Sequence, residues 1–94
     1  MIQSFKDEDT ADLFQARKNR RWQNIKVVAL RRLDVIEAAV NLRDLRIPPG
    51  NHLEALKDDR LGQHSIRIND QYRICFVWKD DGAHEVEIVD YHNS

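Results

Sequence analysis

The sequence predicts an α+β fold, with two N-terminal helices packed on one face of a small antiparallel β-sheet. Two observations lead to this prediction. Apolar residues recur at helical spacing in the first half of the chain and at alternate positions in the second half. Helices and strands segregated along a chain in this way are typical of α+β folds. Because 94 residues suffice for one hydrophobic core, we expect residues 1–94 to form a single domain.

The N-terminal segment begins with a short alternating stretch, residues 2–5, which indicates an edge strand. Residues 7–9 offer N-cap candidates and acidic first-turn side chains, both of which favour the start of a helix. This helix is expected to run to about Ala16. Residues 17–21 then form a polar, basic connector.

The strongest periodic signal predicts a long helix after the connector. Its apolar residues are spaced 3, 4, 4, 3 and 4 apart, which places them on one helical face: Trp22, Ile25, Ala29, Leu33, Ile36 and Val40. Residues 42–45 are expected to extend the helix by a turn. Pro48 and Pro49 then prevent any continuation.

The second half of the chain predicts three strands, at residues 64–69, 72–78 and 85–91. In the first hairpin the expected register pairs Ile68 with Ile74, so that the isoleucines share a face. Arg67 and Arg73 then become diagonal neighbours on the other, solvent-facing side.

The second hairpin has two alternative registers. A two-residue turn at residues 81–82 is the stronger turn signal, but it sets Phe76 against a glutamate. A five-residue loop over residues 80–84 pairs Phe76 with an isoleucine instead. Because burial should outweigh turn preference, we expect the longer loop, which places Tyr91 opposite Arg73.

The last strand ends in Asp90, Tyr91 and His92, which put a carboxylate, a phenol and an imidazole side by side. Chain termini usually carry indifferent polar residues, and the imidazole is the group that titrates nearest physiological pH. A hydrogen-bonded cap on the sheet edge is the simpler interpretation. A functional site is favoured by basic residues on segments that can fold against the same sheet: Arg67, Arg73, Lys57 and Arg60.

Arginine side chains projecting from a rigid sheet are well suited to bind phosphate. With an imidazole and a phenol nearby, the reaction they indicate is cleavage of an RNA phosphodiester. RNA supplies its own 2′-OH as nucleophile, so the protein needs only a base, an acid and positive charge on the phosphate. We expect no metal ion and no cofactor, because the four histidines lack zinc-like spacing.

The formal net charge is only −1, but the charge is unevenly distributed, with seven bases and no acid between residues 17 and 32. A basic binding band and a solvated helix face explain this block equally well. The single cysteine, Cys75, excludes an intramolecular disulfide and is interpreted as a small buried hydrophobe. No apolar run approaches the length of a membrane span, so we expect a cytoplasmic protein with no membrane partner.

Several segments together resemble a known family. They are Leu-Glu-Ala-Leu-Lys-Asp-Asp-Arg from residue 53, Tyr-Arg-Ile-Cys-Phe from residue 72 and the terminal Val-Asp-Tyr-His. With Pro-Pro-Gly-Asn from residue 48, this pattern resembles the HigB-type toxins of the RelE/ParE superfamily, from bacterial type II toxin–antitoxin systems. The resemblance covers essentially the whole chain, and its specific part is residues 48–92.

The resemblance implies a ribosome-dependent mRNA endoribonuclease, or mRNA interferase. Such a toxin cleaves mRNA in the ribosomal A site, leaves a 2′,3′-cyclic phosphate and halts translation and growth. It implies catalytic roles for Asp90, Tyr91 and His92, and a phosphate-binding role for Arg73. The implied partners are mRNA, ribosomal RNA and a HigA-type helix-turn-helix antitoxin, through which alone the toxin would meet operator DNA.

Glu54 stands where some HigB proteins carry a histidine. It is either a catalytic base with a lower unperturbed pKa than histidine or a surface carboxylate. Two other functions stay open: a ParE-like toxin that inhibits DNA gyrase, and a non-catalytic co-repressor module. ParE-like proteins generally lack the terminal Tyr-His pair, which favours the nuclease. The residues expected to bind RNA are Arg67, Lys57, Arg60, Arg20 and Arg21.

Overall fold

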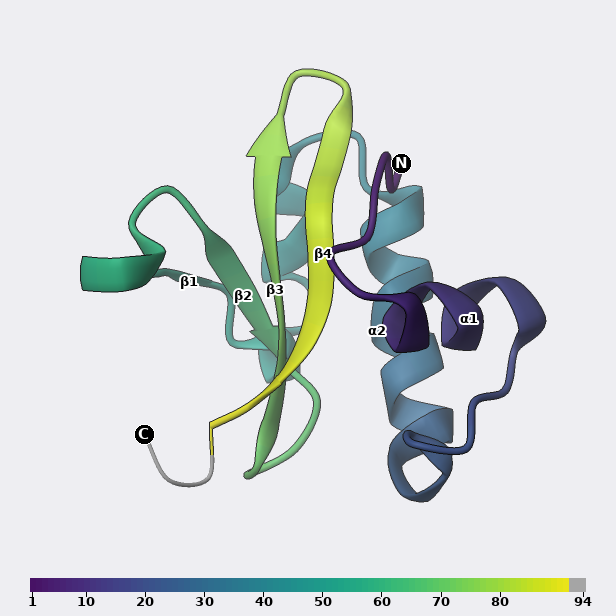
Figure 1. Cartoon of the computed structure of the whole chain (residues 1–94). Helices are drawn as coiled ribbons and strands as arrows, with labels where there is room; N and C mark the ends of the chain where they lie inside the picture. The colour runs from purple at the N-terminus through teal and green to yellow at the C-terminus, as the bar shows by residue number, and fades with distance from the viewer. Residues whose placement is uncertain (92–94) are drawn as a thin grey trace.

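The computed structural model describes residues 1–91. Within them, two α-helices, α1 (Glu8–Ala16) and α2 (Lys26–Ala38), precede a four-stranded antiparallel sheet with the strand order β1-β2-β3-β4 (Figure 1). The strands are β1 (Glu54–Ala55), β2 (His64–Arg67), β3 (Tyr72–Lys79) and β4 (Gly82–Asp90). Short 3₁₀ helices lie at Gln23–Ile25, Leu42–Arg46, Pro49–Asn51 and Asp58–Arg60. The α+β class predicted from the sequence is confirmed.

Helix α1 begins and ends where the sequence predicted. The Asp7 carboxylate accepts a hydrogen bond from the Thr10 backbone N–H at 3.0 Å, so it caps the helix. Arg17 ends the helix in the left-handed conformation, with φ 64°. Thr10 is buried, and its Oγ1 accepts a hydrogen bond from the Ile88 N–H at 3.2 Å, which links the helix to β4.

Helix α2 and the turn before it present the predicted apolar face, and five of its six residues are buried: Trp22, Ile25, Ala29, Leu33 and Ile36. The prediction for Val40 is wrong, because its side chain is 79% exposed. The helix ends at Ala38, and the extended backbone of Ala39 turns the chain away. Residues 42–45 therefore do not extend α2 but belong to a separate 3₁₀ helix.

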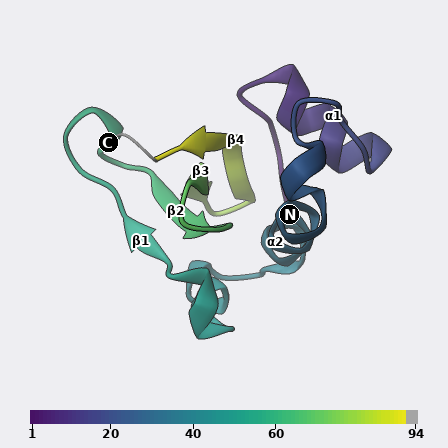
Figure 2. The ribbon, with the colours of Figure 1, turned by 90° about the horizontal axis from the view of Figure 1, so that it is seen from below.

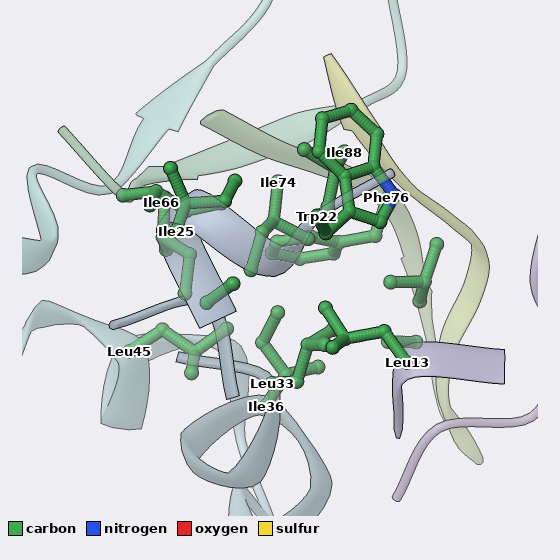
Figure 3. Packing of buried hydrophobic residues seen from close by; sticks show 14 of the residues in the cluster. Leu13, Trp22, Ile25, Leu33, Ile36, Leu45, Ile66, Ile74, Phe76 and Ile88 are labelled. Carbon is green, nitrogen blue, oxygen red and sulfur yellow. The ribbon is translucent and has the colours of Figure 1, made fainter. Parts of the chain in front are cut away.

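The core lies between the helices and the sheet (Figure 3). In both ribbon views α1 and α2 lie on the β4 side of the molecule, away from β1 (Figures 1 and 2). One cluster of buried side chains joins these elements, and its fully buried members include Leu13, Leu33, Ile36, Ile66, Ile74, Phe76 and Val86. Alternation along the strands sends the intervening side chains to the other face of the sheet.

The first hairpin keeps the predicted faces, but its register differs from the prediction by two residues. Ile66, not Ile68, lies opposite Ile74, and Arg67 lies directly opposite Arg73. The side chain of Asn69 explains the shift, because its Oδ1 accepts backbone N–H bonds at the turn, from residues 71 and 72, at 2.8 Å each. A shift of two residues leaves every side chain on its expected face.

Neither register expected for the second hairpin is correct. The strands pair Lys79 with Gly82 at a tight turn, yet they pair Ile74 with Ile88 further along. A β-bulge between Cys75 and Val77 changes the register between these two pairs. On the opposing strand Glu85 has a φ of 53°. The bulge therefore reconciles the tight turn with the burial of the apolar residues of β4.

The N-terminal segment covers the outer edge of β4. Ile2 and Phe5 form isolated parallel bridges with Ala83 and Val86, so the expected edge strand is reduced to two bridges. Backbone hydrogen bonds run from the Gln3 N–H to the Ala83 carbonyl at 2.7 Å, and from the Ala83 N–H to the Met1 carbonyl at 2.9 Å. These contacts satisfy backbone groups that an open edge would expose.

Gly82 is expected to be essential to this edge. Its φ is 126°, and an added Cβ would lie 2.0 Å from the Met1 carbonyl oxygen. We expect Gly82→Ala to lower the free energy of unfolding by about 1–3 kcal/mol through backbone strain, and by a further ~1–3 kcal/mol through the clash. Urea denaturation measures the loss.

Gly62→Ala is the matched control, because Gly62 has a φ of 94° but open space around the added Cβ. Gly62→Ala should lower the free energy of unfolding through backbone strain alone. Equal losses for the two variants would contradict a close packing of the N-terminal segment on Gly82.

Candidate active site

The sheet face opposite the core carries the candidate active site. Its side chains come from alternate positions on adjacent strands and include Ser65, Arg67, Arg73, Cys75 and Glu87. Ser65 and Cys75 are fully buried, which confirms the interpretation of Cys75 as a small buried residue. Arg60, from the loop between β1 and β2, contacts this face through its side chain. So does Tyr91, which follows β4.

The Arg73 side chain contacts both β2 and the β1 segment. Its Nε donates to Ser65 Oγ at 2.7 Å, and its Nη2 donates to the His52 carbonyl oxygen. The same Nη2 lies 3.5 Å from Glu54 Oε1. Because the Arg73 side chain is only 11% exposed, the predicted solvent-facing position is wrong. Arg73 fastens the β1 segment to the sheet.

A groove runs between the β1–β2 loop and the end of β4. It has a volume of about 510 Å³, and its lining residues are Leu56, Lys57, Asp58, Asp59, Arg60, Val89, Asp90 and Tyr91. Four residues predicted from the sequence therefore meet in one place: Lys57, Arg60, Asp90 and Tyr91. The groove combines two cations with a phenol and several carboxylates.

Arg60 is held in a fixed position at this groove. Its Nη1 donates to Glu87 Oε2 and to Gln63 Oε1, both at 3.1 Å. Lys6, from the N-terminal segment, lies 3.5 Å from the same Glu87 oxygen. Glu87 is only 16% exposed, so it anchors both cations from below the surface. A guanidinium held in this way loses little side-chain entropy when it binds an anion.

Tyr91 differs from its predicted place opposite Arg73, because Arg73 pairs with Val89. The Tyr91 N–H donates to the Gln71 carbonyl at 2.6 Å, and its Oη lies 3.7 Å from Cys75 Sγ. Burial, together with the neighbouring Cys75 thiol, raises the pKa of Tyr91 to about 12, although the charges of Arg60 and Arg73 oppose this change. The phenol is therefore protonated at neutral pH and can donate a hydrogen bond to a bound anion.

Gln71 positions the residues at the end of β4. Its carbonyl accepts the Tyr91 N–H, and its Nε2 donates to Asp90 Oδ2 at 3.2 Å. Asp90 itself pairs with Tyr72 in the sheet. The remaining terminal residue of the prediction, His92, lies outside the described residues.

Three of the predicted RNA-binding residues lie outside the groove. Arg67 forms an ion pair with Asp70, beside Arg73 on the sheet. Arg20 and Arg21 belong to the connector before α2, and Arg20 lines a separate depression.

Two contributors to the site were missed by the sequence reasoning, Glu87 and Gln71. The alternation Val-Glu-Ile around residue 87 gave a signal for the first, because it places a carboxylate on the polar face of a central stretch of strand. Such a carboxylate requires a cationic partner when the face is covered. No sequence pattern marked Gln71 as a site residue, because polar residues are common in turns.

The described residues supply the groups for acid–base chemistry on an anion. Among residues 1–91, no group of three or more His, Cys, Asp or Glu side chains is arranged to hold a metal ion. Over the same residues, neither helix has the length and apolar composition needed to cross a membrane.

The fold and the groove with its two cations and its phenol indicate the class of small toxins that the sequence resembles, and comparison with known proteins establishes it. Residues 3–92 match the HigB-like toxin family, described as the RelE-like toxin of the type II toxin–antitoxin system HigB. The chain belongs to this family, whose general activity is mRNA cleavage. A toxin of such a system is paired with an antitoxin.

Two relatives share extended similarity with the chain. It is 39% identical over 85 residues to Toxin HigB-1 of Vibrio cholerae serotype O1, which covers 88% of this chain and 90% of that protein. It is 43% identical over 58 residues to an uncharacterized protein of Haemophilus influenzae, covering 62% of this chain and 57% of that protein.

Proposed function

We propose that this toxin is a ribosome-dependent endoribonuclease that cleaves mRNA by 2′-OH transfer, without a metal ion, and so halts translation. The observation that supports the proposal best is the groove that joins Lys57, Arg60, Asp90 and Tyr91. A gyrase-binding toxin or a co-repressor would not need a protonated phenol beside Lys57 and a fixed Arg60.

The proposed chemistry begins with the phosphate of the scissile bond. Arg60 and Lys57 bind its oxygens, and Arg73 adds positive charge from the sheet beneath. A base takes the proton of the 2′-OH, and the 2′-oxygen attacks phosphorus. The bond from phosphorus to the 5′-oxygen then breaks, and an acid returns a proton to that oxygen. The products are a 2′,3′-cyclic phosphate and a free 5′-hydroxyl.

The proton-transfer groups are assigned from their chemistry. The Tyr91 phenol is protonated at neutral pH, so it donates to the phosphate or to the leaving 5′-oxygen. We assign the second proton transfer to His92, because an imidazole is the side chain that can take up or release a proton near neutral pH, with Asp90 in support. Glu54 pairs with Arg73, which favours an electrostatic role over that of a base.

The proposal extends to the setting in which the toxin acts. Its antitoxin is a HigA-type helix-turn-helix protein, and operator DNA is contacted only through that protein. The toxin works as one domain, residues 1–94, in the cytoplasm, where it meets mRNA and ribosomal RNA on the ribosome.

The test is a cleavage assay with end-labelled mRNA, with and without programmed ribosomes. We expect cleavage only when ribosomes are present, with a 5′-hydroxyl on the downstream fragment. Equal cleavage of free mRNA would overturn the ribosome dependence. Inhibition of gyrase supercoiling with no RNA cleavage would establish the ParE-like alternative instead.

A further inference from the structure

Six of the seven basic residues between positions 17 and 32, all except Arg31, fall into two groups in the structure. Three of them are engaged by the protein itself. Arg17 binds the Asp34 carboxylate through two hydrogen bonds, of 2.7 and 3.0 Å. Arg21 lies 3.4 Å from Asp9, and Arg32 donates to a backbone carbonyl of β2. These three side chains stabilise the fold and are not available as a group to a partner.

The other group faces an open depression of about 400 Å³ beside the connector. Lys18, Arg20 and Lys26 line it, together with Asp12, Asn19 and Gln23. Within residues 1–91, none of these three cations has a carboxylate within ion-pair distance. The one acid in the lining, Asp12, accepts a hydrogen bond from Asn19 Nδ2 at 3.2 Å.

The connector that presents Lys18 and Arg20, just before Lys26 at the start of α2, is fastened by side-chain hydrogen bonds. Asn19 Nδ2 also donates to Asp9 at 3.2 Å, and Asn19 Oδ1 accepts the Arg21 N–H at 2.9 Å. The Arg21 guanidinium lies 4.7 Å from the ring centroid of Trp22, a buried core residue. Asp9 and Asp12 are therefore hydrogen-bonded to Asn19, and these bonds support the connector on which Lys18 and Arg20 lie.

An ordered group of cations around an open depression suits the phosphates of a polyanion. The connector lies on the helical side of the molecule, whereas the β1–β2 loop of the groove lies on the opposite side (Figures 1 and 2). A cationic surface on one side and a groove that presents Lys57 and Arg60 on the other suit a large folded RNA better than one short strand. Because the net charge of the chain is −1, attraction to such an RNA must come from local patches.

We propose that Lys18, Arg20 and Lys26 form a second phosphate-binding surface, which anchors the toxin to ribosomal RNA while the groove holds the mRNA. The inference rests on the proposed function in its choice of partner. It assigns ribosome anchoring and mRNA cleavage to separate surfaces.

The test compares the salt dependence of binding to purified ribosomes for the wild type and the variant Lys18→Gln/Arg20→Gln/Lys26→Gln. We expect at least about tenfold weaker binding and a salt slope smaller by about 2–3, since each phosphate contact adds about 0.7–0.9 to that slope. Binding of a pentanucleotide at the groove should not change. The matched control is Arg43→Gln/Arg46→Gln/Lys79→Gln, which alters the net charge equally at exposed positions elsewhere.

The outcomes separate this inference from the proposed function. Normal ribosome binding by the connector variant, or an equal loss in the control, overturns the inference and leaves the proposed cleavage standing. Ribosome binding that depends on the connector in a protein that cleaves no mRNA supports the inference and overturns the proposed function. A connector variant that loses its antitoxin but keeps the ribosome shows an acidic protein partner instead, and this too overturns the inference.

Discussion

Replacing Tyr91 with phenylalanine is expected to lower the rate of mRNA cleavage by about 10²–10⁴-fold, the usual loss of one proton-transfer group. The substitution removes only the hydroxyl, and the ring can still pack at the groove. The hydroxyl lies 3.7 Å from Cys75 Sγ, and losing a weak contact of this kind should change the stability little. Single-turnover cleavage on programmed ribosomes measures the rate, and urea denaturation measures the stability.

Tyr72→Phe is the matched control. The Tyr72 ring packs against Trp22 on the core side, at 5.4 Å between the ring centroids, and its hydroxyl lies 3.2 Å from Gln71 Nε2. Its loss should leave cleavage nearly unchanged. If the Tyr91 variant cleaves at the wild-type rate, the phenol is not part of the chemistry, and the groove only binds RNA.

A chain truncated after Tyr91 tests the role of His92 in the same cleavage assay. A loss comparable to that of the Tyr91 variant would assign the second proton transfer to the imidazole. Equal single-turnover rates with and without the last three residues would remove His92 from the mechanism. The base would then have to come from the carboxylates at the groove.

The sequence predicted which face of each helix and strand is buried, but it did not predict the register in which the strands pair. The difference has a physical reason. Which side chains are buried follows from periodicity, and the core isoleucines and the α2 face, apart from Val40, were identified correctly. Register depends in addition on turns and bulges. The Asn69 turn and the bulge near Cys75 are formed by local hydrogen bonds and backbone angles that periodicity does not encode.

At the candidate site, too, some features could be predicted from the sequence pattern and others could not. The clustering of Lys57 and Arg60 with the chain end was predicted from segments that fold against one sheet. The burial of Arg73 was not, because it depends on contacts with the His52 carbonyl and Glu54, in the segment that forms the short edge strand β1. The basic block was equally ambiguous, since only tertiary contacts show that Arg17 and Arg21 are bonded to acids.

The second large effect is expected from Ile36→Asp, which should abolish folding. Ile36 is fully buried in the last turn of α2, within the cluster that joins the helix to the sheet (Figure 3). Loss of such a side chain to a small residue already costs about 2–5 kcal/mol, and an unpaired buried carboxylate adds several more. Together these costs equal most of the roughly 5–15 kcal/mol that stabilises a small domain.

Val27→Asp is the control within the same helix, because the Val27 side chain is 67% exposed. Both variants introduce one aspartate into α2, so they share the change in charge and nearly the same change in helix propensity. Far-ultraviolet circular dichroism should show an unfolded Ile36→Asp chain and a folded Val27→Asp chain. If the Ile36 variant melts near the wild-type temperature, α2 does not bury this face. If both variants unfold, the loss comes from the helix itself and not from its packing on the sheet.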